Sequence, residues 1–311
     1  MNASPPPASR SEADSARTRE VLRRLELDVT RRLDGLLQGD YRGLVPGLGS
    51  EPGEARAYTP GDDVRRMDWN VTARMSEPHV RESIADRELE TTVLVDMAPS
   101  LDFGTVRQTK AELAIAAVAA IGMLTDRAGN RLGAIINDGD RLIDIRPGSG
   151  RRHLLSLLHR LATTEPQRGD SSLVSGLARL AGPGHRGGLA VVISDLLQPA
   201  WADPLRAVTL RHETLVIEVI DPRELELPNV GMIELVDART GRVVEVDTRR
   251  AKNRDRFAEA GRVRLADHAR DVRAARADHL LLRTDRDWVL DLAKFVDQRK
   301  RRRRTATTVV A

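Results

Sequence analysis

Short apolar runs alternate along this chain with longer stretches of helical spacing. Three runs are long enough for a buried strand but too short for a packed helix, and they occupy residues 91–95, 188–194 and 214–220. An aspartate directly follows each run: Asp96, Asp195 and Asp221. Ligands of open α/β sheets bind outside the carboxyl ends of the strands, so these positions are candidates for binding or chemistry.

The remaining pattern completes an alternation of strands and helices. Further strands are predicted at 131–137, 141–145 and 279–283, and helices at 109–126, 151–162, 173–180, 201–211, 249–275 and 287–298. This order predicts an α/β fold with a mainly parallel, Rossmann-like sheet and helices on both faces. We also expect a β-hairpin over 233–246, turning at Thr240 and Gly241, at the edge of this sheet.

Two different segments precede the first buried strand. Residues 1–17 are rich in proline, serine and charge, which predicts a disordered leader. Residues 18–37 carry leucine and valine at three- and four-residue spacing, which predicts an amphipathic helix packed on the main domain. We therefore divide the chain into the leader, an N-terminal helix with a turn-rich β segment over 18–88, the α/β domain over 89–298, and a basic disordered tail over 299–311.

The turn-rich part, residues 40–88, is dense in glycine and proline. Short strands are predicted at 55–58 and 79–84. Between them, Pro60 and Gly61 form a turn, and Asp62 or Asp63 can cap a short helix. Trp69 is expected to anchor this segment to the main domain.

Charge is concentrated at the carboxyl-terminal end. The net charge is +4, and six basic residues stand in one run: Arg299, Lys300, Arg301, Arg302, Arg303 and Arg304. The remainder is close to neutral, which does not favour a nucleic-acid-binding body. The run is either a solvated terminus or a contact for an acidic surface, such as anionic lipid, nucleic acid or an acidic partner.

Composition excludes several classes of protein. The chain has no cysteine, so disulfides, thiolate catalysis and cysteine-ligated zinc are excluded. The first twenty residues do not resemble a secretion signal, and no apolar run approaches the length that spans a bilayer. We therefore expect a cytoplasmic protein. The P-loop, Gly-x-Ser-x-Gly and His-Glu-x-x-His motifs are also missing from the sequence.

Oxygen-bearing side chains gather at the predicted strand ends. Ser100 follows Asp96 on the same loop, and Ser171 and Ser172 stand on another loop. Carboxylate and hydroxyl oxygens are ligands that Mg²⁺ prefers. Alternatively, the aspartates cap the following helices or accept hydrogen bonds from loop amides.

These residues resemble the metal-ion-dependent adhesion site of a von Willebrand factor A-like domain. The resemblance implies a Mg²⁺ site made of Asp96, Ser100, Ser171 and Asp195. Ala98 stands where that family carries its first serine, so one direct metal ligand is lost.

A more specific sequence signal is the segment from Tyr58 to Trp69. It is followed by Ala73–Arg74 and, further downstream, by Asp96, Ser100 and Phe103–Gly104. It resembles the bacterial family catalogued as domain of unknown function 58. That resemblance implies a non-enzymatic adaptor that works with a MoxR-type AAA+ ATPase in chaperone-like assembly or metal insertion. The expected partner is a protein, held through the metal site.

Two alternatives belong to other classes. The first is a Mg²⁺-dependent hydrolase that uses Asp96, Asp195 and Asp221. The second is nucleic-acid or membrane binding through the basic run.

Overall fold

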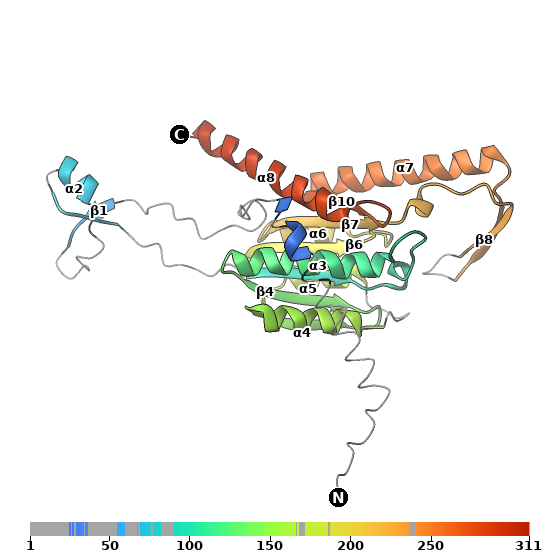
Figure 1. The fold of residues 1–311 in the computed structure, drawn as a ribbon, viewed down its shortest axis with the longest axis horizontal. Helices are drawn as coiled ribbons and strands as arrows, with labels where there is room; N and C mark the ends of the chain where they lie inside the picture. Colours follow the sequence, from blue (N-terminus) through green and yellow to red (C-terminus); the bar gives the residue numbers. More distant parts are fainter. Residues whose placement is uncertain are drawn as a thin grey trace, which may run out of the picture.

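A computed structural model describes residues 25, 27, 29–33, 35, 36, 55–59, 67, 69–75, 77–81, 90–165, 167, 172–185, 187–236 and 241–310. Its centre is a six-stranded sheet in the order β10–β7–β6–β3–β4–β5 (Figure 1). The strands are β3 Glu90–Asp96, β4 Arg131–Asn137, β5 Leu142–Gly148, β6 Gly188–Ser194, β7 Glu213–Ile220 and β10 Asp278–Arg283. All neighbours are parallel except β4 and β5, which form an antiparallel hairpin at one edge. The predicted α/β sheet is confirmed.

Both faces of the sheet are covered, which explains why the central strands β3, β4 and β6 are buried along nearly their whole length. Side chains alternate between the faces along a strand. In β3, Val93 and Val95 join one core cluster, and Leu94, between them, joins the other. A Cβ on Gly176 of α5 (Leu173–Ala181) would lie 2.7 Å from Leu94 Cδ1, so a larger residue there would displace the Leu94 side chain.

The helices divide between the two faces (Figure 1). One face carries α3 Lys110–Arg127, α4 Arg151–Ala162 and α8 Trp288–Val310. The other carries α5 Leu173–Ala181, α6 Ala202–Thr209 and α7 Ala251–Ala274. A capping box of Thr109 and Glu112 starts α3, because each side chain accepts a backbone N–H of the other residue. None of the helices in the described part of the chain is long and apolar enough to span a membrane.

The predicted N-terminal helix packs on the α/β domain, as expected. Residues 29–33 are helical, and the side chains of Val29 and Leu33 are fully buried in the α3 core cluster. Thr30 donates a hydrogen bond to the sulfur of Met123 on α3, and Arg32 pairs with Asp287. The leader, residues 1–17, lies outside the described residues.

The turn-rich segment differs from its prediction in one respect. The two short strands expected at 55–58 and 79–84 are present as β1 Ala55–Ala57 and β2 His79–Arg81, and they pair antiparallel. The helix α2 Trp69–Met75 lies between them in sequence. The expected anchoring by Trp69 is wrong, because its side chain is 70% exposed. The helix is instead tied to β2 by Thr72, whose hydroxyl oxygen accepts the N–H of His79. The turn and cap expected at residues 60–63 lie outside the described residues.

The hairpin predicted at the sheet edge is a separate sheet. The strands β8 Met232–Val236 and β9 Val243–Asp247 pair with each other, and β10 and β5 form the edges of the main sheet. Local alternation and a turn signal predict a hairpin, but they carry no information about which edge it joins.

The last helix is longer than predicted. The helix α8 continues through the basic run to Val310, so the predicted end at residue 298 and the disordered state of residues 299–310 are wrong. Arg299 explains the continuation, because it is 4% exposed and pairs with Glu213 of β7 at 2.6 Å and with Asp278 of β10 at 2.7 Å. The first residue of the run thus joins α8 to two strands.

We predict that the basic residues contribute unequally to stability. Arg299→Ala leaves Glu213 and Asp278 without their cation and should lower the free energy of unfolding by about 2 kcal/mol. Arg301 is 78% exposed and pairs with Asp297 one turn away, so Arg301→Ala should cost less than about 0.5 kcal/mol. Urea denaturation of both variants measures the difference, and equal losses would contradict this role of Arg299.

Candidate functional site at the carboxyl edge of the sheet

The candidate site lies where β3 and β6 end side by side. These neighbouring parallel strands lead to helices on opposite faces, because β3 is followed by α3 and β6 by α6. Such a divergence opens a crevice at the carboxyl edge of an α/β sheet, the usual place for a ligand. The predicted residues Asp96 and Asp195 stand at these two strand ends, as expected from the sequence.

Asp96 is fully buried and held by its neighbours. Asn137 of β4 donates to its Oδ1 at 2.8 Å, and Ser194 of β6 donates to its Oδ2 at 2.8 Å. Burial and the charge of Asp195 raise the pKa of Asp96 to about 7, against the opposing effect of the Ser194 and Asn137 hydrogen bonds. This carboxyl therefore gains or loses its proton near neutral pH.

Asp195 holds a cation that belongs to the chain itself. The ammonium of Lys110, the first residue of α3, lies 2.8 Å from Asp195 Oδ2 and 2.7 Å from Glu224 Oε1. The lysine side chain is completely buried, and Asp195 is 2% exposed. Burial lowers the pKa of Lys110, but the two carboxylates outweigh it, so the pKa lies above its ordinary value. Lys110 is therefore a charged ammonium inside the protein.

This position of a lysine runs against the local preference of a helix. The amino end of a helix carries partial positive charge, which disfavours a cation in the first turn. The two carboxylates offset that cost and the cost of burial, since a buried charge needs partners. The lysine joins the start of α3 to β6 and to the short 3-10 helix Pro222–Glu224 that follows β7.

Asp221 continues the polar network along the edge. Its Oδ1 accepts the hydroxyl of Thr105 at 2.6 Å, and its Oδ2 accepts the hydroxyl of Thr284, after β10, at 2.7 Å. The backbone N–H of Asp221 donates to Glu224 Oε2 at 3.0 Å, and Glu224 in turn holds Lys110. Burial raises the pKa of Asp221, but the hydrogen bonds of Thr105 and Thr284 outweigh it and lower the pKa overall.

The other predicted metal ligands are two serines on loops. Ser100 lies half-buried in the short helix Pro99–Leu101. Ser171 lies outside the described residues. Ser172 accepts the N–H of Ser175 and caps α5.

The carboxylate oxygens of Asp96 and Asp195 are already bonded within the protein and do not form an open cation site. Both oxygens of Asp96 accept hydrogen bonds, and Asp195 accepts the Lys110 ammonium and the N–H of Leu197. In the described part of the chain, no three histidine, aspartate or glutamate side chains are grouped as metal ligands. A cation that reached Asp195 would meet the Lys110 ammonium there. The assignment of Mg²⁺ to Asp96, Ser100, Ser171 and Asp195 stays a prediction from the sequence.

A second buried cluster was missed by the sequence analysis. Glu218, in the middle of β7, is 1% exposed and bonds to His268 Nδ1 at 2.7 Å and to His279 Nε2 at 2.9 Å. Burial raises the pKa of Glu218, but the two histidines outweigh it and lower the pKa overall. A charged residue in an otherwise apolar run was the available signal, but its partners stand 50 and 61 residues away. The cluster ties α7 to two strands.

Comparison with known proteins now gives a family. The family described as "Protein of unknown function DUF58" matches residues 54–267. The uncharacterized protein Rv1480 of Mycobacterium tuberculosis is 51% identical over 303 residues, covering 96% of this chain and 94% of its own length. Among solved structures, an aerotolerance-related membrane protein from Bacteroides fragilis gives a TM-score of 0.46 at 15% identity, covering 69% of this chain and 99% of that one. The VWA domain of SpRpn10 gives 0.38 at 12% identity, covering 68% and 95%.

Removing the buried cation should strongly destabilise the fold. Lys110→Met leaves the carboxylates of Asp195 and Glu224 uncompensated, and we expect a loss of about 3 to 5 kcal/mol in the free energy of unfolding. Adding Asp195→Asn should restore part of the loss, because one of the stranded charges is then gone. Lys252→Met, on the exposed side of α7, should change stability by less than about 0.5 kcal/mol. If chemical denaturation gives the same free energy of unfolding for Lys110→Met and Lys252→Met, the stabilising role of the ion pair is ruled out.

Stability should depend on pH through Asp96. Its pKa is 3.8 in the unfolded reference and about 7 in the folded protein, so the folded state holds a proton that the unfolded chain releases. Between these values the wild type should lose stability relative to Asp96→Asn as pH rises, with a slope of at most about 1.4 kcal/mol per pH unit. Urea titrations from pH 4 to 8 test this. Parallel curves for the two proteins would show that Asp96 titrates normally.

Proposed function

This chain belongs to the DUF58 family of proteins of unknown function. We propose that it is a non-enzymatic adaptor that binds a partner protein at the carboxyl edge of its sheet. The observation that carries this proposal is a group of exposed apolar side chains beside the buried polar network. Phe103 and Val106, on the loop after β3, are 40% and 56% exposed. Leu197, on the loop after β6, is 39% exposed. We call Phe103, Val106 and Leu197 the rim surface.

The buried network holds these loops in place. Thr105, between Phe103 and Val106, donates its N–H and its hydroxyl to Asp221. Leu197 donates its N–H to Asp195, which also binds Lys110. Ordering a loop before binding lowers the entropy lost on association, so a pre-formed apolar surface favours docking. The polar residues at the strand ends thus hold the two loops that carry the rim surface.

The same bonds make catalysis by the strand-end aspartates a weaker proposal. A general base or nucleophile needs a free oxygen within reach of substrate. Asp195 and Asp221 are each engaged by cationic or hydroxyl donors from the chain, and Asp96 is fully buried. The hydrolase alternative therefore has no supporting contact among the described residues.

The proposed partner is a MoxR-type AAA+ ATPase, and the setting is cytoplasmic assembly or metal insertion, as the sequence resemblance implies. In the metal-dependent form of this proposal, Asp96, Ser100, Ser171 and Asp195 would hold Mg²⁺, which would supply an attachment for a partner carboxylate, and the Lys110 ammonium would have to leave Asp195 first. In the metal-free form, Lys110 stays and the rim surface makes the contact.

Binding to a purified MoxR-type ATPase encoded by the same genome tests the proposal. Phe103→Asp and Val106→Asp should each weaken binding at least about tenfold, because they place a charge in the centre of the apolar contact. Val263→Asp, on α7 and 49% exposed in the wild type, is the matched control and should bind normally.

The same assay with EDTA or with added Mg²⁺ separates the two forms. Binding that survives EDTA supports the metal-free form, and binding that needs Mg²⁺ supports the metal-bridged form. Failure to bind in both conditions, or equal binding by the rim variants and the control, would refute the proposal.

A further inference from the structure

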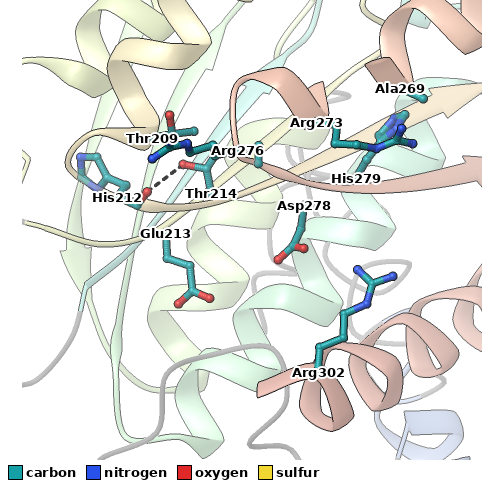
Figure 2. Close-up of a pocket in the computed structure, with 11 residues that line it drawn as sticks. Thr209, His212, Glu213, Thr214, Ala269, Arg273, Arg276, Asp278, His279 and Arg302 are labelled. Atoms are coloured by element: carbon teal, nitrogen blue, oxygen red, sulfur yellow. Dashed lines mark hydrogen bonds between the residues drawn. The ribbon is translucent and has the colours of Figure 1, made fainter. Parts of the chain in front are cut away.

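Two features of the molecule lie apart from the rim surface: an open cavity at the amino ends of β7 and β10, and the β8–β9 hairpin. The cavity has a volume of about 730 Å³. Figure 2 shows Arg273, Arg276 and Arg302 on separate sides of it, so these charges do not converge on one ligand. The hairpin, in contrast, gathers its exposed side chains on one small sheet.

Exposed apolar side chains are concentrated on this hairpin. Met232, Val236, Val243 and Val244 are between 44% and 62% exposed. The strands β8 and β9 pair with each other and with no other strand of the described residues, and Figure 1 shows β8 beyond the main sheet, near the amino end of α7. A two-stranded sheet is only marginally stable in water, and a contiguous apolar surface marks a site of interaction. The hairpin therefore calls for a partner that covers it.

The register of the hairpin places its exposed side chains together. Residues that are directly paired across two strands lie on the same face, and the faces alternate along each strand. One face therefore carries the pairs Met232–Asp247, Glu234–Glu245 and Val236–Val243, which we call the hairpin face. All of its side chains are exposed except that of Asp247, which is half-buried.

The centre of the hairpin face carries two like charges. Glu234 and Glu245 are opposite each other in the register, and like charges in this position are destabilising. Neither carboxylate forms an ion pair with a cation of the described residues, whereas Asp247, at the end of the face, pairs with Arg250. A cation supplied by a partner would relieve the repulsion between Glu234 and Glu245.

The hairpin is held in shape at its base. Thr248, directly after β9, is fully buried, and its backbone N–H and its hydroxyl both donate to the carbonyl of Gly231, directly before β8. The side chain of Asn253, on α7, donates to the backbone carbonyl of Asp247. The hairpin is thus ordered before a partner arrives, which lowers the entropy lost on docking.

From these observations we propose that the hairpin face docks a protein segment in which a lysine or arginine stands between two apolar side chains. The basic side chain lies between Glu234 and Glu245. Its apolar neighbours lie against Met232 on one side and against the Val236–Val243 pair on the other. Alternate residues of a strand are about 7 Å apart, so an extended partner with this pattern at every second position matches the spacing of the face.

The charges disfavour other occupants. A second copy that docked its own hairpin face about a two-fold axis would bring four carboxylates together, and such like-charge contacts are strongly unfavourable. The phosphates of nucleic acid or of anionic lipid would also meet Glu234 and Glu245. The contact uses residues different from those of the rim surface, so it holds or fails independently of the proposed function.

Selection from a display library of random peptides on the immobilised full-length protein tests the proposal. Peptides enriched by the wild type should carry a lysine or arginine with apolar residues two positions before and two positions after it. One enriched peptide, carrying a fluorescent label, then serves as the probe for anisotropy measurements at about 0.15 M salt, which screens non-specific attraction.

Two double variants separate the charged and the apolar parts of the contact. Glu234→Gln with Glu245→Gln should weaken binding of the probe peptide roughly tenfold, because both carboxylates lose their charge. Val236→Thr with Val243→Thr should also weaken it roughly tenfold, because threonine keeps the preference for a strand and loses apolar contact. Glu259→Gln and Val263→Thr, at exposed positions of α7, are the matched controls and should bind like the wild type.

A charge reversal distinguishes recognition from loss of folding. With Glu234→Lys and Glu245→Lys together, the same selection should enrich peptides that carry aspartate or glutamate at the central position. A hairpin that had unfolded would enrich no such pattern, so this exchange of preference requires a folded hairpin face.

Three results would overturn the proposal. The first is a wild-type selection that yields no common pattern, or a pattern without a central basic residue. The second is equal affinity of the hairpin variants and the control variants for the probe peptide. The third is a wild-type dimer in analytical ultracentrifugation that Val236→Thr with Val243→Thr dissociates, since a second copy would then cover the hairpin face.

Discussion

The carboxyl edge of this protein depends on one buried cation. The ammonium of Lys110 sits between the carboxylates of Asp195 and Glu224, out of contact with water. A buried ammonium is costly unless it is paired, and so is each of these carboxylates. The three groups therefore hold one another in place, and they fix the start of α3 and the loops after β6 and β7 as a unit. Around them, Asp96 accepts hydrogen bonds from Asn137 of β4 and Ser194 of β6. Asp221, after β7, accepts a hydrogen bond from Thr284, after β10.

The strand order explains why these groups meet. The strands β3 and β6 lie next to each other and lead to opposite faces, so their loops part and leave polar strand ends between them. In many proteins such a crevice receives a ligand. Here the chain fills it with its own lysine, and the exposed part of the edge is apolar at Phe103, Val106 and Leu197. This combination favours docking of a protein over chemistry on a small substrate.

Much of the fold was predictable, because strand and helix signals are local. The runs at 131–137, 151–162 and 188–194 match β4, α4 and β6 residue for residue. The aspartates at the strand ends also followed from the apolar runs that precede them. The cation was not predictable in the same way, since Lys110 and its partners are 85 and 114 residues apart. A lysine at the first position of a helix was the one local signal, because a cation there opposes the helix dipole.

The remaining misses have the same origin. No local pattern states that Trp69 is exposed, that the β8–β9 hairpin leaves the main sheet, or that Arg299 reaches Glu213 and Asp278. The basic run was a set of charges in the sequence. In the structure, its first residue, Arg299, joins α8 to β7 and β10, and its fourth, Arg302, lines a cavity.

The most direct test of the central claim is NMR observation of the lysine ammonium groups. The sequence contains four lysines, so the spectrum is simple, and Lys110→Arg assigns the signal of Lys110. We predict one ammonium whose protons exchange slowly with water and which stays charged at pH values where ordinary lysines titrate. A Lys110 signal that exchanges and titrates like that of a surface lysine would contradict the account.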